Sequence, residues 1–307
     1  MSGNPEPNSL FSLGDLAGLL DNDFRQDIRN FAALEETFFK IQPDVVIHMA
    51  AQSQVLTSYE KPYETFDINV TGTLNVLEAT KNLKQLKAIL VVTTDKVYKN
   101  IGTLGRYKET AELGGKDPYS ASKAMADILT QSWQETQSVA PIGIARAGNV
   151  IGGGDNSKDR LIPNLMESIT KGETPSLRNP DAVRPWQNVL DCLNGYLMAI
   201  DKLIEYDKSD IWNFGPNEDV CRTVAEVADF VIKRMDRQFN WEKSQSTLPA
   251  EEKLLLIDSS KARTQLNWKE KFDFESSVNS TIDWYTKEEK ISSLDFMKNE
   301  IKYFNSL

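Results

Sequence analysis

The chain has 307 residues, of which 40% are hydrophobic and 26% are charged. This balance predicts a packed globular protein and argues against disorder, because enough apolar surface is present to form a core. The net charge of −10 argues against binding to nucleic acid or to an anionic membrane, since both need a basic surface.

The cysteines and the histidine predict neither a disulfide nor a metal site. Cys192 and Cys221 are the only two cysteines, and their spacing matches no metal-ligand pattern. His48 is the only histidine, and we expect a packed core residue because no nucleophile is paired with it. No apolar run reaches the roughly 18 residues of a membrane helix, and the first ten residues lack the form of a signal peptide. A cytoplasmic protein fits these features.

Short apolar runs alternate with helical patterns through the first 216 residues. Four runs read as buried parallel strands: 43–50, 87–94, 141–147 and 211–214. Amphipathic helices are predicted at 31–41, 63–83 and 118–137, and a weak strand at 24–28. The alternation predicts an α/β fold with a doubly wound, parallel, Rossmann-like sheet.

The sequence pattern changes after Gly148, where the predicted loops become longer and richer in Gly, Pro and Asn. We expect residues 1–148 and about 185–216 to form the Rossmann-like domain. Residues 149–184 and 217–307 are then expected to form a smaller C-terminal substrate-binding lobe.

Tyr119 and Lys123 are four residues apart on the predicted helix 118–137 and so share one face. A nearby ammonium group favours the phenolate, so we expect Lys123 to lower the pKa of Tyr119. A phenolate formed in this way can take a proton from a hydroxyl group. The pattern is weak alone, because Tyr and Lys often meet at this spacing by chance.

A second set of polar residues follows the predicted strand 87–94. Thr94, Asp95 and Lys96 lie at its carboxyl end, where functional groups gather in open α/β sheets. Taken alone, the segment is typical of an ordinary turn with a capping Asp. Its position, with Thr94 25 residues before Tyr119, makes it more informative.

These motifs resemble the extended short-chain dehydrogenase/reductases. In that family the strand-end Ser or Thr binds the substrate hydroxyl beside the Tyr/Lys pair, and the resemblance gives this role to Thr94. Further segments match in the same order: 50–52, 67–73, 113–119, 145–155, 160–163, 178–180 and 184–187.

Within this family, Thr94-Asp95-Lys96 looks like the CDP-glucose 4,6-dehydratases. The dTDP-glucose enzymes carry Thr-Asp-Glu at this place, and epimerases usually lack the acidic and basic residues that stand here at positions 95 and 96. The resemblance implies transient oxidation of C4 by NAD, loss of water across C5 and C6, and return of the hydride to C6. Lys96 would remove the C5 proton and Asp95 would protonate the departing hydroxyl. The product would be CDP-4-keto-6-deoxyglucose, a precursor for deoxysugar and polysaccharide synthesis.

The resemblance also implies two sets of binding residues and no metal. NAD would be contacted at the adenine, phosphate, ribose and nicotinamide by Asp27, Ile28, Ala50, Ala51, Gln52, Thr93, Tyr119 and Lys123. Arg184 would bind the substrate diphosphate, because a guanidinium can form paired hydrogen bonds to phosphate oxygens. Further substrate contacts are expected from Asn149, Arg160, Leu161, Ile162 and Arg178.

The family begins with a strand, a Gly-rich turn and a helix that together hold the pyrophosphate. No such motif occurs in these 307 residues. We therefore expect an N-terminally incomplete sheet, with an open apolar edge on the strand 43–50, and weak or no NAD binding. A fragment, a misplaced start or a deletion completed by a partner chain would each explain this.

Other readings stay open at this point. They are a dehydratase or epimerase acting on another nucleotide sugar, and a truncated, non-catalytic protein that only binds nucleotide sugar. Helices 63–83 and 118–137 resemble the pair that forms the dimer interface in relatives, which predicts a homodimer. Met125, Leu129 and Trp133 would serve either that interface or the core of one subunit.

Overall fold

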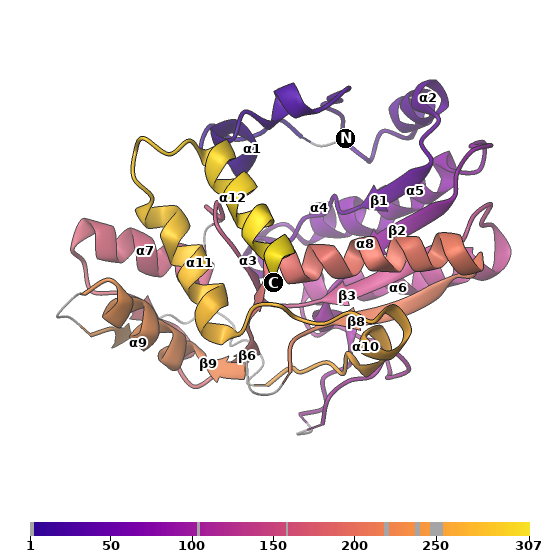
Figure 1. Cartoon of the computed structure of the whole chain (residues 1–307). Coiled ribbons are helices and arrows are strands. Elements are labelled where there is room, and N and C mark those ends of the chain that lie inside the picture. Colours follow the sequence, from indigo (N-terminus) through magenta and orange to yellow (C-terminus); the bar gives the residue numbers. More distant parts are fainter. Residues whose placement is uncertain (1–2, 103–104, 158, 218–220, 237–239, 246–253) are drawn as a thin grey trace.

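The computed structural model of the chain describes residues 3–102, 105–157, 159–217, 221–236, 240–245 and 254–307. Its central sheet has four parallel strands in the order β1-β2-β3-β8 (Figure 1). The strands are β1 (Val45–His48), β2 (Ala88–Val92), β3 (Ile142–Ala147) and β8 (Asp210–Phe214). All four lie within or beside the predicted apolar runs, so the predicted parallel sheet is confirmed.

Strand β2 is buried on both faces because its side chains alternate between two cores. Ala88 and Leu90 belong to one hydrophobic cluster, and Ile89 and Val91 belong to another. This double burial explains the near-continuous apolar run in the sequence.

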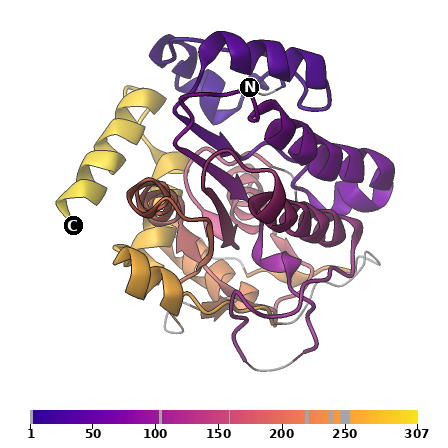
Figure 2. The ribbon, with the colours of Figure 1, turned by 90° about the vertical axis from the view of Figure 1, so that its right-hand side faces the viewer.

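Helices cover both faces of the sheet, as a doubly wound fold requires (Figures 1 and 2). One layer contributes to the cluster that contains Ile89, and its helices are α2 (Phe31–Ile41), α5 (Gly72–Ala79) and α6 (Pro118–Thr136). The other layer contains α8 (Val189–Tyr206) and α10 (Ser260–Leu266), which pack against β8 and each other.

The predicted helix 63–83 is three consecutive elements. They are α4 (Pro62–Phe66), the π-helical turn η2 (Asp67–Thr71) and α5. The π turn contains Asn69, whose side chain bonds both Gln52 and Ser122. Single π-helical turns within α-helices are rare and are often found at functional sites.

The weak strand predicted at 24–28 is an extended segment with one bridge residue, Arg25. Ile28 is buried against Gly72 and so fastens this segment to α5. The described residues provide no neighbouring strand here, which explains why the segment does not form a ladder.

A second core lies beside the sheet and includes Ile169, Val231 and Val278. Its helices are α7 (Leu161–Lys171), α9 (Val224–Arg234) and α11 (Phe274–Thr286). Short paired strands surround it: β4 (Val150–Ile151) with β7 (Gln187–Asn188), β5 (Ser176–Leu177) with β10 (Glu242–Lys243), and β6 (Val183–Pro185) with β9 (Cys221–Thr223).

Helices from the two ends of the described chain are neighbours, although the N and C marks lie well apart (Figures 1 and 2). The short helix α1 (Leu10–Leu13) lies beside α12 (Ser293–Ser306), and η1 (Leu16–Leu19) follows it. Helix α3 (Val55–Glu60) and the turn η3 (Asp95–Val97) complete the elements. No helix among the described residues has the length and apolar character needed to span a membrane.

Strand β1 forms one border of the sheet as far as the described residues go. A groove of about 510 Å³ runs along it, lined by residues from 20–50 together with Val76. Ile47 and Met49 are 43% and 53% exposed there. This is the open apolar edge that the sequence predicts.

We expect the packing of α8 on the sheet to be a main source of stability. Leu203 is fully buried and packs over Gly143 of β3, whereas Leu197 on the same helix is 58% exposed. Leu203→Ala should reduce the free energy of unfolding by about 2–5 kcal/mol through lost transfer energy and a cavity. Leu197→Ala should change it by less than about 0.5 kcal/mol. Urea unfolding of both variants tests this, and equal losses would contradict it.

Candidate active site

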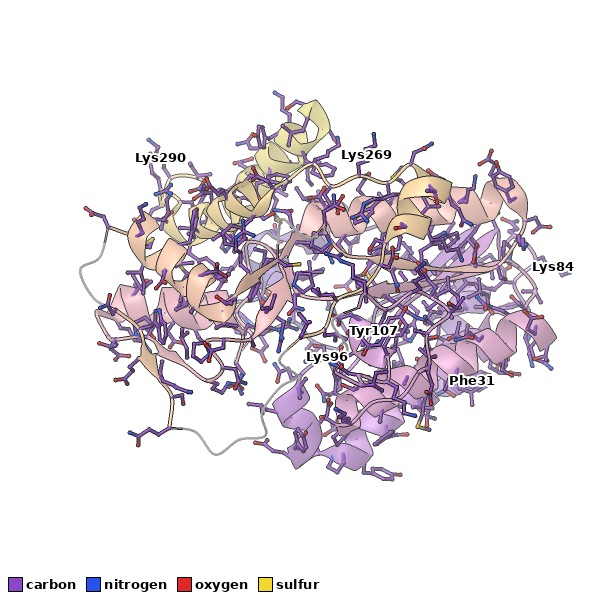
Figure 3. All side chains as sticks on the ribbon, turned by 90° about the horizontal axis from the view of Figure 1, so that it is seen from below. Phe31, Lys84, Lys96, Tyr107, Lys269 and Lys290 are labelled. Atoms are coloured by element: carbon purple, nitrogen blue, oxygen red, sulfur yellow. The ribbon has the colours of Figure 1, made fainter. Side chains whose placement is uncertain are left out.

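A pocket of about 420 Å³ opens at the carboxyl ends of β2 and β3. Parallel strands bring these ends to the same edge of a sheet, so segments far apart in sequence meet there. Every expected substrate residue lines this pocket, as do four of the five expected catalytic residues: Thr94, Asp95, Lys96 and Tyr119. Figure 3 shows Lys96 in the middle of the molecule, while Lys84, Lys269 and Lys290 lie toward its periphery.

The segment after β2 turns sharply because Thr94 caps the short helix η3. Its hydroxyl accepts a hydrogen bond from the Lys96 amide at 3.3 Å and donates one to Asp95 Oδ1 at 3.0 Å. Such side-chain caps stabilise the first turn of a helix. The cap fixes the directions in which Asp95 and Lys96 leave the strand.

Asp95 is an unusual carboxyl group because it is almost completely buried and only partly hydrogen-bonded. Its Oδ2 has no hydrogen-bond partner among the described residues. Burial raises its pKa above the ordinary value, while the charges of Lys96 and Arg184 and the Thr94 hydrogen bond lower it in part. A carboxyl group in this setting favours the protonated form, which is the form of an acid catalyst.

Gly148, at the end of β3, leaves space for this carboxyl group. A β-carbon at position 148 would overlap the carboxylate of Asp95. The close approach therefore requires glycine at 148.

Tyr119 lies at the start of α6 and faces Thr94. Burial raises the pKa of Tyr119 to about 12, although the hydrogen bond shared with Thr94 and the charge of Arg160 lower it in part. The predicted lowering by Lys123 is therefore wrong for this structure, because the loss of hydration outweighs the favourable charges.

Lys123 is buried beneath the pocket rather than in its wall. Its Nζ donates to the carbonyl oxygen of Val92 at 2.8 Å, and burial lowers its pKa to about 8. Lys123 lies four residues after Tyr119 on α6 and so shares its helix face, with its ammonium group at the end of β2.

The expected substrate residues approach the pocket from the second core. Asn149 adopts a left-handed backbone with φ of 48°, a conformation that Asn tolerates better than most residues. Arg160 directly precedes α7, and it lines the pocket together with Leu161 and Ile162 of the first turn of that helix. Arg184 is buried and close enough to Asp95 to lower its pKa. Arg178 donates to the carbonyl oxygen of Asp159 at 3.3 Å.

The expected cofactor residues are more spread out. Thr93 and Tyr119 line the pocket, whereas Ile28 and Ala50 line the groove along β1. Gln52 bonds Asn69 and Thr65, and Ala51 precedes it in the same loop. Asp27 forms an ion pair with Arg29 at 2.6 Å.

The residues present fit one half of a dinucleotide. Tyr119 and Lys123 offer a hydroxyl and an ammonium group at the carboxyl end of β2, where the ribose and nicotinamide would lie. The stretches that the structure describes contain no Gly-rich strand–turn–helix for the pyrophosphate.

His48 is a satisfied core residue, as the sequence predicts. Its Nε2 lies 3.0 Å from the Thr73 hydroxyl, and burial lowers its pKa to about 3. It is therefore uncharged at neutral pH. Neither cysteine forms a disulfide, and no group of three possible metal ligands gathers within the described part of the chain.

Sequence reasoning missed several pocket residues. Tyr196 reaches the pocket from α8, and Thr281 reaches it from α11. The segment 53–56 and residues 175–177 also line it. No local motif marks these positions, so only the folded chain reveals them.

Comparison with known proteins places this geometry in a family. The profile of the family described as GDP-mannose 4,6 dehydratase matches residues 21–281. The chain belongs to this family. This match confirms the resemblance to the extended short-chain dehydrogenase/reductases.

One curated relative is the CDP-glucose 4,6-dehydratase of Salmonella typhimurium, which is 35% identical over 92% of this chain and 81% of the relative. Solved structures agree on the fold. A dTDP-glucose 4,6-dehydratase from Bacillus anthracis in complex with NAD has a TM-score of 0.76 and 26% identity, over 91% of this chain and 85% of that one. A UDP-glucuronic acid 4-epimerase from Bacillus cereus has a TM-score of 0.81 and 22% identity, over 93% and 90% of the chains.

The burial of Asp95 predicts a distinct pH dependence of stability. Because its folded-state pKa is raised, the native protein binds more protons than the unfolded chain, and stability falls as the pH rises from the ordinary Asp pKa of about 3.9. Asn at this position cannot ionise. The free energy of unfolding of the wild type should therefore fall relative to Asp95→Asn as the pH rises, and the difference should level off above the folded-state pKa. Urea titrations across this range test the expectation, and a difference that does not vary with pH would contradict it.

Proposed function

We propose that this protein is a nucleotide-sugar 4,6-dehydratase that converts CDP-glucose to CDP-4-keto-6-deoxyglucose. The observation that carries the proposal is the position of a buried carboxyl group and a lysine, Asp95 and Lys96, beside Tyr119 in one pocket. A sugar held against Tyr119 would present its neighbouring carbons to this pair. Epimerisation at C4 needs no such acid and base.

The five proposed catalytic residues have the following roles. Tyr119, hydrogen-bonded to Thr94, accepts the proton of the C4 hydroxyl as a phenolate and becomes the neutral phenol, the form that its raised pKa favours. The charge of Lys123, on the same face of α6, favours the phenolate before this transfer. Lys96 removes the C5 proton once C4 is a ketone. Asp95, whose raised pKa favours the protonated form, gives its proton to the departing C6 hydroxyl.

NAD is the proposed cofactor, and it would accept a hydride from C4 and return one to C6. The Bacillus anthracis relative was crystallised with NAD. In this chain Thr93, Tyr119 and Lys123 would hold the nicotinamide end, Ala50, Ala51 and Gln52 the phosphates and ribose, and Asp27 and Ile28 the adenine end. Ile28 and Ala50 already share the groove along β1.

The nucleotide diphosphate would lie on the other side of the pocket. Arg184 and Asn149 would bind the phosphates, and Arg160, Leu161, Ile162 and Arg178 would line the nucleoside part; all six residues line the pocket. We propose residues 149–184 and 217–307 as the nucleotide-sugar lobe, and 1–148 with about 185–216 as the cofactor domain. The choice of CDP-glucose is supported by the Salmonella typhimurium relative and by Lys96.

The main alternative is a protein that binds nucleotide sugar without catalysis. It is favoured by the lack of a Gly-rich turn among these residues. A dehydratase acting on another nucleotide sugar is the second alternative, and the dTDP-glucose relative supports it.

Calorimetric titration of the purified 307-residue chain with NAD⁺, with and without CDP-glucose, followed by an assay for the 4-keto product, separates these functions. Turnover of CDP-glucose in preference to dTDP-glucose and UDP-glucose supports the proposal. Turnover of another nucleotide sugar instead would replace the substrate. CDP-glucose binding with neither NAD⁺ binding nor turnover would leave a binding protein.

Tyr119→Phe removes the phenolic proton acceptor but keeps the ring. We expect kcat to fall by about 10²–10⁴-fold with little change in KM, because the group acts in the transition state. Tyr206→Phe, at an exposed position of α8, is the matched control and should keep wild-type rates. A Tyr119→Phe variant with wild-type kcat would rule out this role.

We also propose a homodimer formed through residues 63–83 and 118–137, in the cytoplasm, where cysteines stay reduced. On α6, Met125 and Ile128 are 48% and 54% exposed, whereas Trp133 is buried in the core. Tyr63 of α4 is also highly exposed. Exposed apolar side chains on two helices that pack together support a protein contact.

Ile128→Glu places a charge in the proposed interface and should shift the protein from dimer to monomer. Ile301→Glu is the control, since Ile301 has similar exposure but lies on α12, away from this face. Sedimentation velocity of both variants and the wild type tests the expectation. A monomeric wild type, or an Ile128→Glu variant that stays dimeric, would refute this interface.

A further inference from the structure

A fully buried ion pair lies beneath the segment Thr94–Val97, which follows β2 and is called the catalytic segment below. Arg146 of β3 meets Asp127 of α6 through two parallel hydrogen bonds, from Nε to Oδ2 at 2.8 Å and from Nη2 to Oδ1 at 2.7 Å. The two side chains are 1% and 0% exposed. The remaining terminal nitrogen, Nη1, donates to the Tyr98 hydroxyl and to the Glu109 carbonyl oxygen, both at 2.9 Å.

The ion pair holds two hydroxyl groups that flank the catalytic segment. Thr93, just before the segment, donates its hydroxyl proton to Asp127 Oδ2 at 3.0 Å. Tyr98, just after it, accepts from Arg146 and donates to Asn213 Oδ1 at 2.6 Å. Both ends of the stretch Thr94–Val97 are therefore fixed to the same pair.

The same pair is also tied to the helix that carries Tyr119. Asp127 is four residues after Lys123 and eight after Tyr119, so all three share one face of α6. The pair thus joins the two groups of catalytic residues, one after β2 and one on α6, through a single rigid contact.

Stability alone gives a poor reason for such a pair. Removing two charges from water costs several kcal/mol per ion, and hydrophobic replacements are often as stable. A hydrophobic pair, however, offers no fixed acceptor for the Thr93 hydroxyl and no donor for the Tyr98 hydroxyl. The arrangement is better explained by the orientation that it imposes.

We propose that Tyr98 and Thr93 are positioning residues, which act through the Arg146–Asp127 pair to hold Asp95 and Lys96 in place for the elimination of water. The proposal rests on the function proposed above. Loosening the segment should slow elimination more than C4 oxidation, because the segment itself carries Asp95 and Lys96, whereas α6 carries Tyr119.

Tyr98→Phe is the test, because it removes only the hydroxyl and keeps the ring. Tyr107→Phe is the matched control: its ring stacks on Tyr98 at 5.4 Å, but its hydroxyl bonds Asn100 and Ile101 instead (Figure 3 labels Tyr107). We expect Tyr98→Phe to lower kcat for CDP-glucose by about 10- to 100-fold, with KM within about twofold. The fraction of reduced cofactor during turnover, followed by its near-ultraviolet absorbance, should rise.

A second readout does not depend on activity. The amides of Lys96, Val97 and Tyr98 bond back to Thr94 and Asp95. Their hydrogen exchange should be about tenfold faster in Tyr98→Phe than in Tyr107→Phe, because local opening controls exchange. Thr93→Val should speed exchange at 96–98 in the same way. This exchange measurement replaces that on Tyr98→Phe if Tyr98→Phe does not fold, and no kinetic comparison is made with Thr93→Val because Thr93 is also a proposed cofactor contact.

The outcomes separate this inference from the function itself. Slower elimination with faster exchange at 96–98 supports it. The inference would be overturned if the Tyr98→Phe variant had the same rates, fraction of reduced cofactor and amide exchange as Tyr107→Phe. A lower kcat with an unchanged fraction of reduced cofactor and unchanged amide exchange would also overturn it. If the wild type turns over no nucleotide sugar, the proposed function fails. In that case amide exchange alone tests whether Tyr98 holds the segment Thr94–Val97. Faster exchange in Tyr98→Phe supports this, and unchanged exchange contradicts it.

Discussion

The pocket depends on the parallel register of β2 and β3. Val92 pairs with Ala145, so the two strands end at the same edge of the sheet, and the segments after them leave side by side. The turn with Asp95 and the turn with Gly148 therefore touch, although they are more than fifty residues apart in sequence. An antiparallel neighbour or a shifted register would separate them and leave no shared pocket.

Burial decides how the titratable groups in this region behave. It raises the pKa of Tyr119 and Asp95 and lowers that of Lys123 and His48, so in all four it favours the neutral form. Charged groups offset this only where they come close, as Arg184 and Lys96 do at Asp95. Of these four groups, Asp95 and Tyr119 line the pocket, where a neutral carboxyl group is the form that can give up a proton.

The sequence predicted the repeating parts of the fold well. The apolar runs and helix patterns located the four strands, and helix α2 matches its predicted range 31–41. It failed where tertiary contacts decide local structure. The π turn at 67–71 depends on Asn69 reaching Gln52 and Ser122, and no periodic pattern carries that information.

The candidate site shows the same division. A motif at a strand end indicated Thr94 and Asp95, and the spacing of Tyr119 and Lys123 on a helix indicated Tyr119, because strand ends and helix faces can be read from local sequence. Tyr196 went unnoticed because its role depends on where α8 crosses the sheet. The pKa of Tyr119 was predicted in the wrong direction because the number of protein atoms around a side chain cannot be counted from its neighbours in sequence.

Gly148 carries a consequence for any redesign of this protein. The carboxyl group of Asp95 occupies the space that even a methyl group at position 148 would need. Alanine there would do more than crowd the pocket: its methyl group would compete for the same volume with the carboxyl group that we propose as the proton donor. Libraries that vary the loop after β3 should therefore begin at position 149 and leave 148 untouched.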